Sequence, residues 1–179
     1  RWPGNGWSKK LQPFYSIAKK MLGTTQAPNY AETDLLLKQC AKQMRKTDSF
    51  KPVDVGVYFG KQGKTVPDPY FNGKGPERAG CTLCGGCMVG CRHNAKNTLD
   101  KNYLYLAEQL GVTIKPEREV LDIFPSSSGY TLLIQKSTGI RKPTTNIKTK
   151  KVILSGGVMG SVKLLFLCRK RGTLKLLSN

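Results

Sequence analysis

Four cysteines stand close together in this chain, at Cys81, Cys84, Cys87 and Cys91. Their spacing, C-x2-C-x2-C-x3-C, is that of the loop with which bacterial ferredoxins bind a four-iron cluster. A single zinc ion is the second interpretation, although four-thiolate zinc sites are usually built from two separate cysteine pairs. The third is a glycine-rich turn whose thiols pack against neighbours or stay reduced. The residues by themselves leave all three interpretations open.

Three further side chains could do chemistry, depending on their surroundings. His93 is the only histidine, and it could join a metal shell or act as a base. A polar residue near a helix start is the simpler interpretation of it. Cys40 and Cys168 lie in helical patterns, where we expect them to be buried as small apolar side chains. Clustered cysteines without a secretory signal favour reduced or metal-bound thiols, and hence a cytoplasmic location.

A second pattern with chemical meaning lies near the C-terminal end. The apolar run Val152–Leu154 leads into Ser155, Gly156 and Gly157, and a helical pattern follows. Glycines let a ligand approach the backbone, and a helix N-terminus favours phosphate oxygens. Taken alone, the pattern is better explained by a tight turn between a strand and a helix, because it is not the G-x-G-x-x-G motif of a dinucleotide site.

The composition restricts the classes of protein to consider. The chain has 179 residues, about one domain, and a net charge of +19. Residues 131–179 contain eleven Lys or Arg and no acidic residue. Such charge suits nucleic acid or an anionic surface, but no recognised binding motif accompanies it, so we expect no nucleic-acid partner. A zinc-stabilised, basic nucleic-acid-binding module stays an alternative. No apolar run is long enough to cross a membrane.

The elements that must position these residues follow from periodicity and from helix-ending glycines. Ser8 and Thr33 are the predicted caps of the first two helices, and Gly23 ends the first. Asn97 or Thr98 caps a third, which Gly111 ends. A glycine- and proline-rich loop precedes the cysteines, and long loops of this kind usually serve a site. The predicted helices are 8–22, 34–45, 99–110 and 158–168, the loop is 60–80, and the strands are 50–59, 112–114, 120–124, 130–135, 147–151 and 152–154.

The residues around the cysteines form one long and specific pattern. It comprises Pro67–Phe71, Gly75–Arg78, Gly80–Arg92 and Asn94–Glu108. This pattern resembles the glucose–methanol–choline (GMC) flavin oxidoreductases, and in particular their bacterial cholesterol-oxidase-like branch. Weaker agreement extends to residues 7–23 and 152–165, so the resemblance covers nearly the whole chain.

The resemblance implies a mixed α/β (α+β) fold. It would comprise part of a Rossmann-like FAD domain, with an antiparallel meander, interleaved with part of a substrate domain. Residues 1–96 would belong mostly to the substrate side, with the Gly/Pro loop and the cysteine motif. Residues 97–179 would form the partial FAD domain.

The resemblance also implies an activity, the oxidation of the CH–OH group of a small apolar alcohol such as a sterol. Glu119 and Val120 match the place where the family holds the flavin adenine, and Ser155, Gly156 and Gly157 match the turn near the ribose and pyrophosphate. The family's first phosphate loop and its catalytic histidine have no match here, so no catalytic residue is expected. We therefore expect an internal fragment, inactive alone, whose partner is the rest of the same polypeptide. An iron–sulfur electron-transfer module built on the four cysteines is the alternative function.

Overall fold

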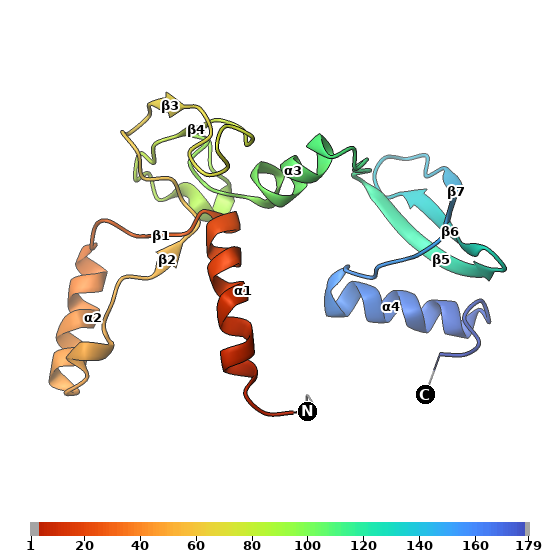
Figure 1. Cartoon of the computed structure of the whole chain (residues 1–179), viewed down its shortest axis with the longest axis horizontal. Helices are drawn as coiled ribbons and strands as arrows, with labels where there is room; N and C mark the ends of the chain where they lie inside the picture. Colours follow the sequence, from red (N-terminus) through yellow and green to blue (C-terminus); the bar gives the residue numbers. More distant parts are fainter. Residues whose placement is uncertain (1–3, 178–179) are drawn as a thin grey trace. The chain divides into compact units, whose positions relative to one another are not determined.

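The computed structural model describes residues 4–177 and divides the chain into two units, Arg1–Thr113 and Ile114–Asn179 (Figure 1). Both helices and antiparallel sheets are present, which confirms the mixed α/β class. The assignment of residues 1–96 and 97–179 to a substrate domain and an FAD domain stays a prediction.

The first unit consists of helices and very short strands joined by long loops. Its strands form two antiparallel pairs, β1 with β2 and β3 with β4. Its elements are α1 (Trp7–Leu22), β1 (Thr25–Gln26), α2 (Glu32–Gln43), η1 (Thr47–Ser49), β2 (Asp54–Val55), β3 (Thr65–Val66), β4 (Arg78–Ala79), η2 (Gly86–Val89), η3 (Leu99–Lys101) and α3 (Tyr103–Gln109).

The first two helices were predicted correctly, but their caps were not. Helix α1 starts one residue before Ser8 and ends at Gly23, whose left-handed backbone (φ 58°) terminates it as expected. Helix α2 begins before Thr33, and the N–H of Ala31 donates to the carboxylate of Asp34 over 2.8 Å. Cys40 on α2 is exposed, contrary to the prediction, because this side of α2 faces solvent in the unit described.

Two other predictions for this unit need correction. The strand expected over 50–59 shrinks to β2, because only Asp54 and Val55 find partners on another strand. The side chain of Asn97 does not cap a helix but bonds to Arg78 and to the carbonyl of Gly23. Helix α3 starts instead after Asn102, and Gly111 follows its end, as predicted, with φ 88°.

The guanidinium of Arg78 holds the loops of the first unit together. The residue is 0% exposed, and its donors reach four oxygen acceptors in three chain segments. Nε donates to Asn97 Oδ1 over 2.8 Å, and Nη2 donates to the carbonyl of Lys101 over 2.7 Å. Nη1 donates to the carbonyls of Pro76 and Glu77 over 2.9 and 3.0 Å. These hydrogen bonds offset the cost of burying the charge and join the segments that supply the acceptors.

We predict that replacing Arg78 with Met destabilises the first unit by about 3–5 kcal/mol, because buried acceptors would lose their donors. Trp7 begins helix α1 of this unit, and residues 114–179 contain no tryptophan, so denaturation followed by tryptophan fluorescence reports on the first unit. Arg92→Met is the control, because Arg92 is exposed and its removal should change the unfolding free energy by less than about 0.5 kcal/mol. Equal midpoints for the two variants would contradict the role assigned to Arg78.

The second unit is a three-stranded antiparallel sheet with one long helix. The strands β5 (Arg118–Ser126), β6 (Gly129–Lys136) and β7 (Thr144–Thr149) lie in that order, and α4 (Gly157–Lys170) follows. The meander predicted from the sequence is therefore present, with longer first strands. Gly129 is required at the β5–β6 turn: its φ is 142°, and a Cβ there would lie 2.2 Å from the carbonyl oxygen of Thr149.

Two predicted strands are absent from the part of the chain that the structure describes. Residues 112–114 form no strand, and neither does Val152–Leu154. The latter run was expected to be buried on both faces, yet Ile153 is 89% exposed. The run is apolar enough for a central strand, but among residues 4–177 no neighbouring strand pairs with it.

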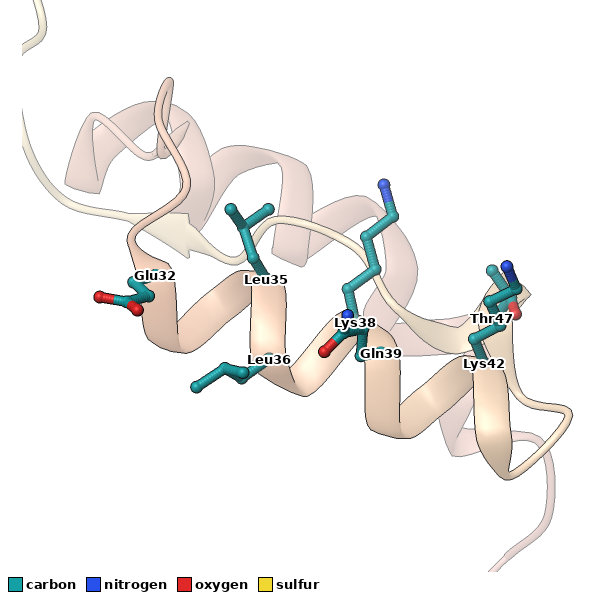
Figure 2. Close-up of a pocket in the computed structure, with 7 residues that line it drawn as sticks. All are labelled: Glu32, Leu35, Leu36, Lys38, Gln39, Lys42 and Thr47. Carbon is teal, nitrogen blue, oxygen red and sulfur yellow. The ribbon is translucent and has the colours of Figure 1, made fainter.

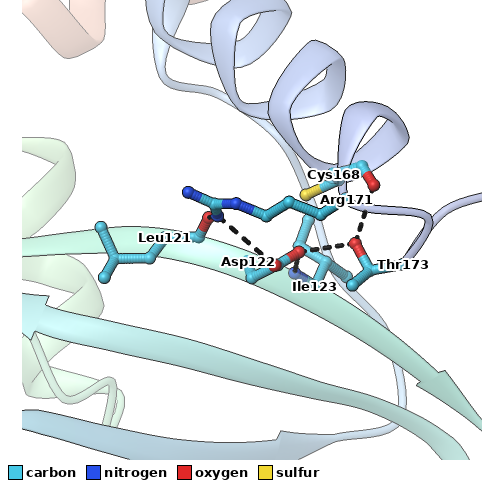
Figure 3. Close-up of polar contacts among 6 residues, drawn as sticks. All are labelled: Leu121, Asp122, Ile123, Cys168, Arg171 and Thr173. Carbon is cyan, nitrogen blue, oxygen red and sulfur yellow. Dashed lines mark hydrogen bonds and ion pairs between the residues drawn. The ribbon is translucent and has the colours of Figure 1, made fainter.

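A buried carboxylate fastens the end of α4 to β5 (Figure 3). Asp122 on β5 accepts a hydrogen bond from Thr173 Oγ1 over 2.6 Å and lies 3.4 Å from the guanidinium of Arg171. Cys168 lies beside it and is fully buried, as predicted. Burial alone would raise the pKa of Asp122, but these bonds, led by that from Thr173, outweigh burial and hold the pKa below its ordinary value.

We predict that the second unit loses stability in acid through Asp122. Because its pKa is lower in the folded state, the carboxylate stabilises the fold above the unfolded pKa of about 3.9, and this contribution disappears as the pH falls through the folded value. Asp122→Asn should lose about 1–3 kcal/mol at pH 7 and show a flatter acid dependence. Circular dichroism during denaturation at several pH values measures both effects. Glu117→Gln, which alters an exposed carboxylate, should behave like the unmodified chain.

Candidate functional site

A partly open pocket of the second unit lies between β5, the 152–156 segment and α4. Its volume is about 590 Å³, within the usual range of ligand pockets. Four of the five residues predicted to contact the flavin line it: Glu119, Val120, Ser155 and Gly156. Gly157, the fifth, is the first residue of α4 at the rim. Positions more than thirty residues apart in sequence therefore line one pocket, and their contact with a flavin stays a prediction.

The wall formed by β5 offers backbone hydrogen-bonding groups. β5 is an edge strand, since the sheet order among the described residues is β5-β6-β7. Along such an edge, alternate residues direct N–H and C=O groups away from the neighbouring strand. The pairing with β6 is also interrupted between Val120 and Asp122, which leaves Leu121 as a bulge. A planar group with both donors and acceptors, such as an adenine, matches this wall.

The wall formed by the start of α4 offers unsatisfied N–H groups. No side chain caps the helix, whose N-cap is Gly156. Gly157 has φ 70°, and a Cβ at Gly157 or Gly160 would have no neighbour within 4 Å. The start of α4 therefore combines open space with the positive electrostatic potential of a helix N-terminus. Helix N-termini of this kind bind phosphate oxygens.

Sequence reasoning missed the helical face that completes this pocket. It consists of Gly160, Lys163, Leu164, Leu167 and Arg171. Their spacing is that of one face of a helix, so periodicity counted from the Gly156–Gly157 turn would have found them. Arg171 donates to the carbonyl of Leu121 over 2.6 Å, so it closes the far end of the pocket.

The four cysteines of the motif line a second, much smaller cavity, in the first unit. Its volume is about 20 Å³. Cys81 and Cys91 are half-buried, whereas Cys84 and Cys87 are exposed, and all four thiols are free. Within residues 4–177, no three Cys, His, Asp or Glu side chains are arranged to hold a metal ion. The four cysteines of the motif therefore lie around one cavity, but their thiols do not converge on a single metal position.

His93 and Cys91 lie at the edge of this cavity. The imidazole is exposed, and the structure gives it no catalytic geometry. Burial alone would raise the pKa of the Cys91 thiol, but hydrogen bonds from backbone N–H groups, that of Ala95 first, and the charge of Lys101 outweigh it, so this pKa lies below its ordinary value.

A shallow hollow beside α2 has no comparable chemistry. Its volume is about 390 Å³, and its lining residues come from α2 and from Thr47 (Figure 2). Leu35 and Lys38 extend to one side of the helix, whereas Leu36 extends to the opposite side. These side chains converge on no common point, so we assign this hollow no function.

Among the described residues, no helix is both long and apolar enough to span a bilayer.

Curated proteins named cholesterol oxidase are similar to this chain. One from Acinetobacter baumannii is 39% identical over 184 residues, which cover 97% of this chain and 33% of the relative. Proteins from two strains of Mycobacterium tuberculosis are 42% identical over 179 residues, which cover 96% of this chain and 31% of each relative. The chain thus spans about a third of the length of the curated relatives it matches, which fits the expectation of a fragment.

No family model and no solved structure matches the chain. The curated relatives nevertheless confirm the resemblance predicted from residues 67–108: over nearly its whole length, this chain is similar to about one third of the cholesterol oxidases of the GMC type.

Proposed function

We propose that the second unit holds the adenine and pyrophosphate of FAD in an oxidoreductase that acts on the CH–OH group of an apolar alcohol, a sterol in particular. One observation carries the proposal. Glu119, Val120, Ser155 and Gly156, which the resemblance assigned to the flavin, line one pocket of about 590 Å³.

The residues present fit this ligand at both ends. The free edge of β5 at Glu119 and Val120 supplies backbone donors and acceptors for the adenine. The uncapped start of α4 supplies N–H groups for the pyrophosphate, and the open space at the Cβ positions of Gly157 and Gly160 leaves room for its oxygens. Apolar side chains such as Leu132 and Leu164 line the space between the two. When bound, the flavin supplies the capacity to accept a hydride from a carbinol carbon.

The substrate class rests on the relatives, whose name specifies cholesterol. The base for the reaction would come from outside this chain, because His93 lies beside the cysteines in the first unit rather than in the flavin pocket. The rest of the same polypeptide would also cover exposed apolar residues such as Ile153, Val158 and Met159. In this proposal Val152–Leu154 joins a parallel sheet of a Rossmann-like domain, a setting that suits a wholly apolar strand.

We predict that ADP, which carries the adenine and pyrophosphate of FAD, binds this pocket. In an NMR titration of the chain, the amide signals of Val120, Ser155, Gly156 and Gly157 should shift together and saturate. Adenosine, which lacks phosphate, should shift Val120 but leave the amides at the start of α4 nearly unchanged. Saturable shifts elsewhere, with these four amides unaffected, would exclude the pocket as the nucleotide site.

The matched variants are Gly160→Trp and Met159→Trp. Gly160 lines the pocket, and an added Cβ there would meet no atom within 4 Å, so we expect a tryptophan at this position to block the pocket. Met159 is 87% exposed and does not line it. We expect Gly160→Trp to weaken ADP binding at least tenfold and Met159→Trp to leave it within twofold.

The activity is tested in a chimera. The matching third of the Mycobacterium tuberculosis relative is replaced by this chain, and oxidation of cholesterol is followed. We expect flavin binding and turnover in the chimera and in its Met159→Trp variant, and loss of both in its Gly160→Trp variant. A chimera that binds FAD but oxidises only short, polar alcohols would refute the sterol assignment and leave the flavin site standing.

A further inference from the structure

The cavity enclosed by the cysteine loop, residues 81–91, has no part in the proposed flavin site. Thr82 lines it together with the four thiols, and its hydroxyl is buried without a hydrogen-bond partner among the residues described. Buried hydroxyls nearly always have a partner, so an orphaned one beside four free thiols calls for an explanation. A group bound inside the loop would provide one.

The loop is held by backbone hydrogen bonds at its ends and by one side-chain hydrogen bond, from Lys96, at its middle. The N–H of Cys81 donates to the carbonyl of Tyr58 over 2.9 Å, and the N–H of Tyr58 donates to the carbonyl of Ala95 over 2.8 Å. Between these anchors, Gly85 and Gly90 have φ of 71° and 103°. Such positions rotate easily, so the exposed middle of the loop can move outward while its ends stay in place.

Backbone N–H groups already point at two of the sulfurs. Leu83 donates to Cys81 Sγ, and Ala95 donates to Cys91 Sγ, each over 3.4 Å. Leu83 adopts a left-handed backbone (φ 58°), an unfavourable conformation for this residue, in making its bond. N–H donors of this kind orient metal-binding thiolates and adjust the potential of iron–sulfur centres.

The surrounding charge is also suitable. The loop between its first and last cysteines contains no charged residue. Lys96 Nζ lies 2.8 Å from the carbonyl oxygen of Cys87, and Lys101 Nζ lies 3.4 Å from that of Lys96. Two ammonium groups at the base of the loop would offset the negative charge of a thiolate-bound centre.

The arrangement of the thiols distinguishes between a single ion and a cluster. One tetrahedral ion needs its sulfurs to meet at a point, and within the described residues no three ligating side chains do so. A four-iron cluster takes one thiolate at each iron, so its sulfurs surround a volume instead. The C-x2-C-x2-C-x3-C spacing is that of such a cluster.

From these observations we propose that Cys81, Cys84, Cys87 and Cys91 bind a four-iron iron–sulfur cluster. The cavity of about 20 Å³ is smaller than the cluster, so binding widens the loop by rotation at Gly85 and Gly90. The cluster also occupies the space that Thr82 Oγ1 faces, where its sulfide can accept the hydroxyl hydrogen.

The test is anaerobic reconstitution of the chain with ferric iron, sulfide and a thiol that reduces part of the iron, because the oxidised cluster contains both ferric and ferrous ions. We expect about four iron and four sulfide per chain, with the broad visible absorption of iron–sulfur charge transfer. Chemical reduction should bleach this absorption and produce a paramagnetic signal. Cys84→Ser and Cys87→Ser should each lower the iron content at least fourfold. Because both thiols are exposed, serine should leave the circular dichroism of the chain unchanged.

Cys40→Ser is the matched control, because Cys40 is exposed but lies outside the loop, and its iron content should equal that of the unmodified chain. Three results would overturn the proposal. The first is a folded chain that retains less than one iron. The second is equal iron content in Cys84→Ser and Cys40→Ser. The third is one zinc per chain that iron and sulfide cannot displace, since that shows a single-ion site.

Discussion

The first unit depends on one buried cation, the guanidinium of Arg78, whose bonds reinforce backbone hydrogen bonds between the same segments, such as that from the N–H of Ala79 to the carbonyl of Asn94. Burial lowers the pKa of Arg78, while the nearby Tyr70 and Asp68 raise it, and the side chain keeps its charge. Through Asn97 the same bonds extend to Gly23 at the end of α1. The cysteine loop begins only three residues after Arg78, so the position of its first thiol follows from this bonding.

In the second unit, the buried carboxylate of Asp122 joins separate segments, as the guanidinium of Arg78 does in the first. Asp122 replaces apolar contacts at the junction of β5 and α4, where Cys168 is the one fully buried apolar side chain of the helix. Few apolar residues are buried in either unit, and those that are include small ones such as Ala79 and Ala95. With so little apolar burial, directional bonds to ionic groups determine which segments lie together.

Local features were predictable from the sequence, and features that depend on distant residues were not. Gly23 and Gly111 end helices because their left-handed backbone is a property of the residue itself, and the β5–β6 hairpin follows from alternation around a glycine turn. The exposure of Ile153 could not be predicted, because burial of a strand depends on its neighbours. The hydrogen bonds of Arg78 were equally unpredictable. Its acceptor Asn97 lies 19 residues away in the sequence, and no periodic pattern connects the two residues. The residues predicted to contact the flavin were identified from the family resemblance. Lys163 and Arg171 were recognised as pocket residues only from the position of helix α4 in the structure.

The attachment of α4 is uneven along its length. Its C-terminal end is fixed to β5 through Asp122, whereas Val158 and Met159 near its start are 79% and 87% exposed. Because α4 is anchored mainly at its C-terminal end, thermal motion should displace the Gly156 end most and the Arg171 end least. A nucleotide held at both β5 and the first turn of α4 would stop this swing. Part of its binding energy would then be spent on restraining the helix, and release of the nucleotide would begin with the helix start moving outward.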